Sequence, residues 1–141
     1  MFRDKVQAVL QHAVMMPNDC DWIDGRKLVV DRMLTRVVPY PWWYLPRVMR
    51  CIAELRGWTA ADVVTELVGM LCAKNAAYGD SALEPARIFS QAPASEAIRV
   101  RIDDKLSRLK SKSLADNEDT LMDLAGYMVL LILAEESSWR P

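Results

Sequence analysis

The chain is poor in glycine, histidine and cysteine, and each shortage excludes a class of protein. Its 141 residues include 5 glycines, 1 histidine and 3 cysteines. The single histidine, His12, gives little support to Ser-His-Asp or Cys-His catalysis. The cysteines at positions 20, 51 and 72 form no CxxC pair. A zinc site is therefore not expected, and the usage is typical of a reduced, cytoplasmic protein.

Glycine-rich phosphate loops, long apolar runs and an excess of one charge are also missing. The sequence contains neither a Walker A nor a GxGxxG loop. The longest apolar run, 124–134, has about half the length of a membrane span. The charged N-terminus is not followed by the apolar segment of a secretory signal. Because 18 Lys and Arg balance 19 Asp and Glu, we expect neither a membrane nor long nucleic acid as a partner.

Hydrophobic residues make up 52% of the chain, and their spacing is helical almost throughout. No segment alternates convincingly as a strand would. The sequence therefore predicts a single all-α domain, 1–141, built as a bundle of about five to six helices. We expect these helices over about 3–16, 24–37, 47–56, 59–75, 96–112 and 117–137.

Several boundaries are marked by specific residues. Gly57 is expected to end one helix, and Thr59 with Asp62 forms a capping box for the next. Between the second and third expected helices, residues 39–46 hold 3 prolines and 4 aromatics, which argues against a helix interior. This stretch is either a rigid connector whose aromatics cover the core, or a platform that stacks a base or grips a partner.

The last expected helix carries two carboxylates one turn apart, Asp119 and Asp123. At 100° per residue they share a stripe with Gly126 and Tyr127, on a side that faces the core or a cleft. Carboxylates there are costly unless a cation meets them, and a divalent metal is the usual candidate. Complementation of the helix dipole is the alternative, but it does not explain Asp123, which lies a full turn deeper.

The helix over 59–75 offers a third possible metal ligand, Glu66. It shares a face with Asp62, Gly69 and Ala73. This face is by default solvated. The two small residues, however, would permit close approach of another helix or a ligand.

Basic side chains are placed to meet phosphate at two points. Arg101, Lys105 and Arg108 lie on one stripe of the fifth helix and could clamp a polyphosphate, unless they form a solvated flank neutralised by Asp104. At the end of the preceding helix, Lys74 and Asn75 could contact phosphate or sugar while Tyr78 packs on a base. The alternative there is a plain helix end with Gly79 as its C-cap.

Four blocks in order carry a resemblance. They are K-N-x-x-Y-G-D from 74, R-I-F-S from 87, R-x-R-I-D-D-K-L-S-R-L from 99 and E-D-T-L-x-D-L-x-G-Y from 118. The pattern, over about 66–133, resembles the nucleotide-modification-associated domain 1 family of phages and prophages. That family is distantly similar to the all-α nucleoside triphosphate pyrophosphohydrolases of the MazG and dimeric dUTPase group.

The resemblance implies a MazG-like core over 59–137, preceded by N-terminal helices and the aromatic connector over 1–58. In that group, carboxylates from two antiparallel helices bind Mg²⁺, and a metal-activated water splits the α–β phosphate bond. Carried over, Glu66, Asp119 and Asp123 would hold the metal and serve catalysis. The nucleotide would contact Lys74, Asn75, Tyr78, Asp80, Arg101, Lys105, Arg108 and Tyr127.

The expected function is thus Mg²⁺-dependent binding of a nucleoside triphosphate, with hydrolysis to the monophosphate and pyrophosphate. We also expect a homo-oligomer, a dimer or tetramer, in the cytoplasm of a bacterial or phage-infected cell. Two alternatives stay open. Where the MazG group has an E-E-x-x-E cluster, only Asp62 and Glu66 occur here, which favours a non-catalytic nucleotide-binding protein. A helical interaction module using Trp42 and Trp43 is the other.

Overall fold

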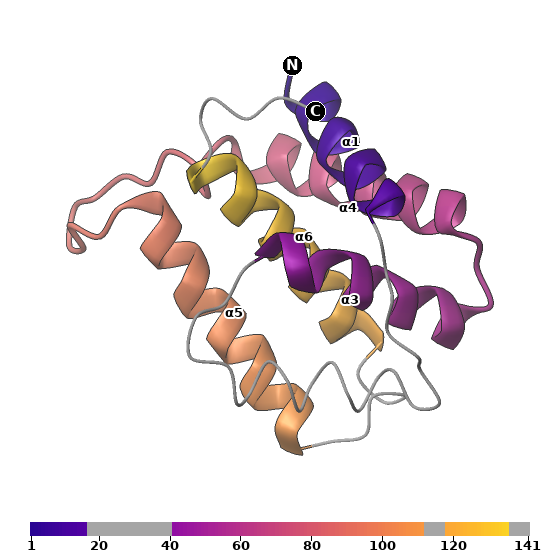
Figure 1. The fold of residues 1–141 in the computed structure, drawn as a ribbon. Coiled ribbons are helices and arrows are strands. Elements are labelled where there is room, and N and C mark those ends of the chain that lie inside the picture. The colour runs from indigo at the N-terminus through magenta and orange to yellow at the C-terminus, as the bar shows by residue number, and fades with distance from the viewer. Residues whose placement is uncertain (17–40, 112–117, 136–141) are drawn as a thin grey trace.

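The computed structural model describes residues 1–16, 41–111 and 118–135, which form helices and no strand. The helices are α1 (Phe2–Met15), α3 (Pro41–Arg56), α4 (Ala60–Tyr78), α5 (Ala94–Ser111) and α6 (Glu118–Glu135) (Figure 1). The predicted all-α class is confirmed for this part of the chain. The helix expected over 24–37 lies outside the described residues.

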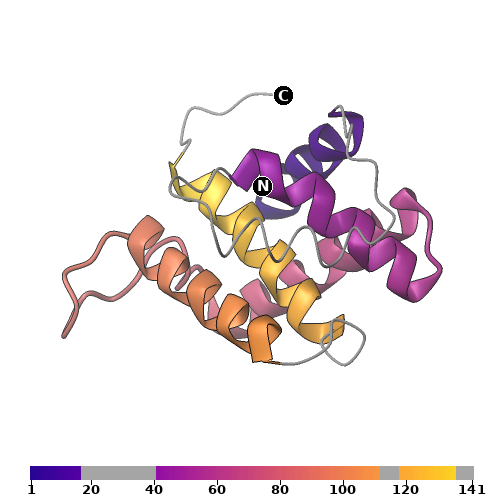
Figure 2. The ribbon, with the colours of Figure 1, turned by 60° about the horizontal axis from the view of Figure 1, so that its bottom comes forward.

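Helix α6 is the centre of the bundle and packs against each of the other described helices, most extensively α5 and α3 (Figures 1 and 2). It is apolar on nearly every side, which is typical of a helix enclosed by others. Its fully enclosed side chains are Leu121, Leu124, Ala125, Met128, Val129 and Ile132. Despite this, none of the described helices has the length and hydropathy needed to cross a membrane.

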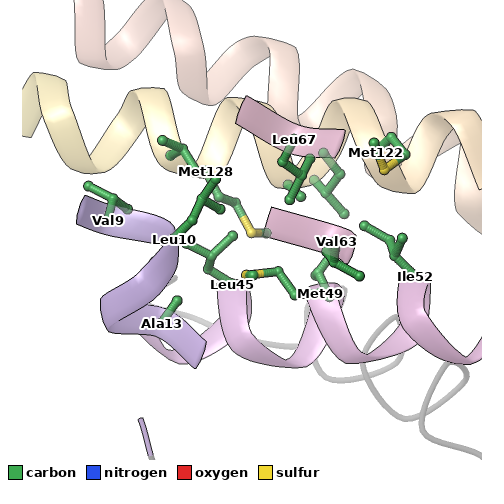
Figure 3. Packing of buried hydrophobic residues seen from close by; sticks show 14 of the residues in the cluster. Val9, Leu10, Ala13, Leu45, Met49, Ile52, Val63, Leu67, Met122 and Met128 are labelled. Carbon is green, nitrogen blue, oxygen red and sulfur yellow. The ribbon is translucent and has the colours of Figure 1, made fainter. Parts of the chain in front are cut away.

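The apolar stripes of α1 and α4 meet α3 and α6 in one core. Figure 3 shows Leu10 of α1, Leu45 and Met49 of α3, Leu67 of α4 and Met128 of α6 converging there. On α4 the buried side chains are Val63, Val64, Leu67, Val68 and Leu71, at the spacing of one helical face, while Ala60 at its start is exposed.

The prediction that 39–46 cannot be helix interior is wrong from Pro41 onward, because α3 begins there rather than at 47. Pro41 is the first described residue of α3. Pro46 does interrupt the helix interior, but it is buried with Tyr44 in the core. A proline inside a helix costs about 3 kcal/mol, and full burial of Tyr44 and Leu45 at about 1.5–3 kcal/mol each offsets that cost.

Arg47 reinforces the same turn of α3. Its guanidinium donates a hydrogen bond to the Trp43 carbonyl oxygen at 2.7 Å and lies 3.8 Å from the centre of the Trp43 ring. The stretch therefore supplies the core, as the first interpretation held, but it does so as a helix and not as a connector.

The helix ends follow local rules. At the start of α4, the Asp62 N–H donates to Thr59 Oγ1 at 3.1 Å and the Thr59 N–H donates to Asp62 Oδ2 at 2.9 Å, so the predicted capping box is confirmed. Gly57, with φ of 66°, follows the last residue of α3 as expected. Helix α4 continues past the predicted 75 to Tyr78. Residues 79–93 then project from the bundle (Figures 1 and 2).

Close approach of two helices occurs at Gly126 and not at Gly69, where the sequence left a solvated face and a close approach both open. A Cβ on Gly126 would lie 2.9 Å from Met70 Cε and 3.2 Å from Leu71 Cδ2, so a side chain there would have to displace both of these α4 side chains. Gly69 is exposed, and a Cβ there would have no atom within 4 Å. The face of α4 that holds Gly69 is therefore solvated.

We predict that Gly126→Val lowers the free energy of unfolding by about 1–3 kcal/mol, because the added atoms overfill the α4–α6 contact. Gly69→Val is the matched control. It should leave stability within about 0.5 kcal/mol, since the position is open. Urea unfolding of both variants measures the difference, and equal effects would contradict the packing described.

Candidate functional site

A cavity of about 630 Å³ opens between α4, α5, α6 and the projecting segment 79–93. Its floor is apolar and includes Leu71, Ile98, Gly126 and Leu130. The polar and aromatic side chains around it include Lys74, Asn75, Tyr78, Arg101, Asp123 and Tyr127, together with Phe2 and Ser81. Each of the first six was predicted from sequence as a site residue. The volume is within the range of small-molecule sites, about 300–1,000 Å³.

Asp123 is the most constrained polar group of the cavity. Lys74 Nζ of α4 donates to its Oδ1 at 2.9 Å, and Lys105 Nζ of α5 lies 3.2 Å from its Oδ2. The three residues, the Lys–Asp–Lys bridge, come from three different helices. Lys105 is the most enclosed, with 14% of its side chain exposed, whereas Lys74 is 49% exposed. The bridge therefore fastens α4 and α5 to α6 at the wall of the cavity.

The bridge sets the ionisation of Asp123. Partial burial by itself raises the pKa of the carboxyl, but the hydrogen bonds and positive charges of Lys74 and Lys105 outweigh it. The pKa of Asp123 consequently lies below its ordinary value of 3.8. Asp123 is thus a carboxylate at neutral pH, in contact with two ammonium groups.

The aromatic and amide groups lie at the mouth. Tyr78 is 73% exposed at the end of α4, and Tyr127 is half-buried on α6. With its amide nitrogen turned toward the helix end, Asn75 donates to the Gly79 carbonyl oxygen at 3.1 Å and to Asp80 Oδ1 at 2.8 Å. Asn75 therefore stabilises the end of α4 as well as facing the cavity, while Asp80 does not line it.

The structure does not bring the predicted metal ligands together. Glu66 is exposed on α4, away from the cavity. Asp119 accepts a hydrogen bond from Arg56 Nη2 of α3 at 3.1 Å, with its side chain 99% exposed. Within 1–16, 41–111 and 118–135, no group of three or more His, Cys, Asp or Glu could hold a metal ion. Only Asp123 of the proposed ligand set faces the cavity.

The three basic residues predicted to share one stripe of α5 do not all reach the cavity. Arg101 lines the cavity, Lys105 reaches it through Asp123, and Arg108 is exposed outside it. Sequence reasoning missed Phe2 of α1 and Pro85 of the projecting segment, both of which line the cavity. Nothing in the helical periodicity places a chain terminus or an irregular segment beside α4, so these two had no signal in the sequence.

Comparisons with protein-family models, with curated proteins and with solved structures found no match. The resemblance to the nucleotide-modification-associated family therefore stays a prediction. Any functional argument has to come from the cavity and its charges.

The lowered pKa predicts a pH-dependent contribution to stability. A carboxyl whose pKa is depressed in the folded state stabilises the fold above its unfolded pKa, and this contribution is lost as pH falls through the folded pKa. Asp123→Asn should therefore lower the melting temperature at pH 7 by about 3–5 °C, for about 1 kcal/mol of ion pairing. The difference should shrink as pH falls below the ordinary value of 3.8 and vanish once pH is below the lowered pKa of Asp123, because protonated Asp123 is also neutral. Melting curves between pH 3 and 7 test this, and a constant difference would contradict it.

Proposed function

We propose that this chain binds a nucleotide in the cavity between α4, α5 and α6, with the phosphates toward the basic side chains. The observation that carries the proposal is the convergence of cations on one apolar-floored cavity. Lys74 and Arg101 line it, and Lys105 reaches its wall at Asp123. Ammonium and guanidinium groups bind phosphate through charge-assisted hydrogen bonds, which are about twice as strong as neutral ones.

The rest of the cavity suits a nucleoside. Tyr78 and Tyr127 place two aromatic rings beside the apolar floor, and stacking of a base on an aromatic ring contributes about 1–3 kcal/mol. Asn75 adds an amide that can hydrogen bond to a sugar or base edge. The cavity thus combines cationic and aromatic side chains, which match the phosphates and the base of a nucleotide.

Hydrolysis of a nucleoside triphosphate to the monophosphate and pyrophosphate is the second candidate, and the ionised Asp123 favours it. Mg²⁺ in phosphate sites is commonly held by one or two carboxylates together with the phosphates of the substrate. It would supply charge neutralisation and an activated water. In the described part of the chain the cavity offers Asp123 alone, so binding without turnover has the stronger support.

The interaction-module alternative has less support. Trp42 and Trp43 are half-buried against the core. The Trp42 ring meets His12 edge-on at 5.1 Å, and the Trp43 ring lies against Arg47. These rings already have contacts within the fold, so they are poorly placed to form a stacking platform or the centre of a partner interface.

A thermal-shift panel of nucleoside mono-, di- and triphosphates, with and without Mg²⁺, tests the proposal. A ligand at 100 times its Kd should stabilise the protein by about 2.7 kcal/mol. Chromatography of the same mixtures then separates the candidates. Stabilisation without product supports binding, a Mg²⁺-dependent monophosphate supports hydrolysis, and no stabilisation by any nucleotide would refute both and favour the interaction module.

Lys74→Gln should weaken binding of the best nucleotide by about 10- to 100-fold, because it removes a charge-assisted hydrogen bond of about 1.5–3 kcal/mol. Arg50→Gln is the matched control, since it removes one positive charge from an exposed position of α3 outside the cavity. Isothermal titration measures both. Equal losses would mean that overall charge, and not the cavity, determines affinity.

A further inference from the structure

We propose that Asp123 occupies the position of a ligand phosphate, and that binding exchanges its carboxylate for a terminal phosphate dianion on Lys74 and Lys105. This inference rests on the proposed function, which places phosphates in the same cavity. It adds the class of ligand: phosphate monoesters and pyrophosphates, and not phosphodiesters.

The bridge has the geometry of an anion-binding site that is occupied by a carboxylate of the protein, that of Asp123. Each carboxylate oxygen of Asp123 has its own ammonium partner, Lys74 at 2.9 Å and Lys105 at 3.2 Å. The two lysines come from different helices and converge on one point. Among the described residues, Asp123 is the only acidic group paired with either of them. Phosphate oxygens accept hydrogen bonds from ammonium groups in the same way, so a phosphate fits the same pair of donors.

The exchange is feasible because the bridge is only partly buried. The Asp123 side chain is 28% exposed and Lys74 is 49% exposed, at the wall of an open cavity. The Lys74–Asp123 pair, exposed to this degree, contributes little, about 1 kcal/mol or less, because water screens it, whereas Lys105 is more enclosed. Asp123 can therefore leave its partners by a side-chain rotation without opening the fold.

Charge determines which ligands gain from the exchange. Asp123 carries one negative charge against two ammonium groups, so it leaves one positive charge uncompensated. A terminal phosphate, whose second pKa is about 6, is close to a dianion above pH 7 and compensates both. A phosphodiester is a monoanion and gains nothing over the carboxylate that it would replace. Asp123 therefore acts as a filter against diesters and weakly charged anions.

If Asp123 instead helped the ligand to bind, removing its charge would weaken binding. A carboxylate that positions the lysines for the ligand, or that binds a metal on which the ligand depends, is needed for binding. A carboxylate that competes with the ligand lowers its affinity. Removing the charge of Asp123 separates the two, because Asp123→Asn keeps the size of the side chain and its capacity for hydrogen bonds.

The test is isothermal titration of the full chain with inorganic pyrophosphate at pH 7.5 in EDTA. Asp123→Asn should tighten the Kd by about tenfold, or about 1.4 kcal/mol. Asp103→Asn is the matched control, since it removes one negative charge from an exposed position of α5 outside the cavity, and its effect should stay within about twofold. Unchanged or weaker binding by Asp123→Asn, or no binding by any of the proteins, would overturn the proposal.

Two further measurements sharpen the result. Asp123→Ser, which also lacks the charge, should tighten binding too, and this outcome guards against a defect peculiar to the Asn variant. Dimethyl phosphate, a monoanionic diester, should fail to displace pyrophosphate from the unsubstituted protein, and competition equal to that of inorganic phosphate would overturn the selectivity.

If pyrophosphate binds as predicted while no nucleotide stabilises the protein, the exchange stands and the nucleotide assignment fails. Nucleotide binding without tightening by Asp123→Asn refutes the exchange alone.

Discussion

The candidate site depends on one half-buried carboxylate of the central helix, Asp123. Helix α6 packs against all the other described helices, and a charge at Asp123 would be costly there without partners. Lys74 of α4 and Lys105 of α5 meet it from two sides. The same contact that satisfies the charge also places two cations at the wall of a cavity with an apolar floor. The bridge therefore joins three helices at the same point where it charges the wall of the cavity.

Periodicity predicted the fold well where a helix has one apolar side. The apolar faces of α1 and α4 are mostly buried, although Val14 of α1 is 43% exposed, and the predicted Thr59 capping box is formed. It failed at Pro41 to Pro46, because local rules count the cost of proline but not the burial of the aromatic side chains beside it. Tertiary packing overrides a local preference in such a case.

The sequence predicted which site residues share a helix face, but not which side chains they contact. A helical wheel correctly grouped Asp123, Gly126 and Tyr127 on the side that lines the cavity. It could not show that Asp119, one turn earlier, turns instead to Arg56, which is distant in sequence. Which partner a charged side chain meets depends on how the helices cross, and that information lies in the packing of the core. For the same reason the sequence could not show that, of two residues on α4, Lys74 lines the cavity and Glu66 does not.

The most direct test of this account is a crystal structure of the protein with a nucleoside diphosphate and Mg²⁺. The account predicts terminal phosphate oxygens about 2.7–3.0 Å from the Nζ atoms of Lys74 and Lys105, with the Asp123 carboxylate turned away from both. A nucleotide bound elsewhere, or phosphates joined to an undisplaced Asp123 through a metal ion, would contradict it.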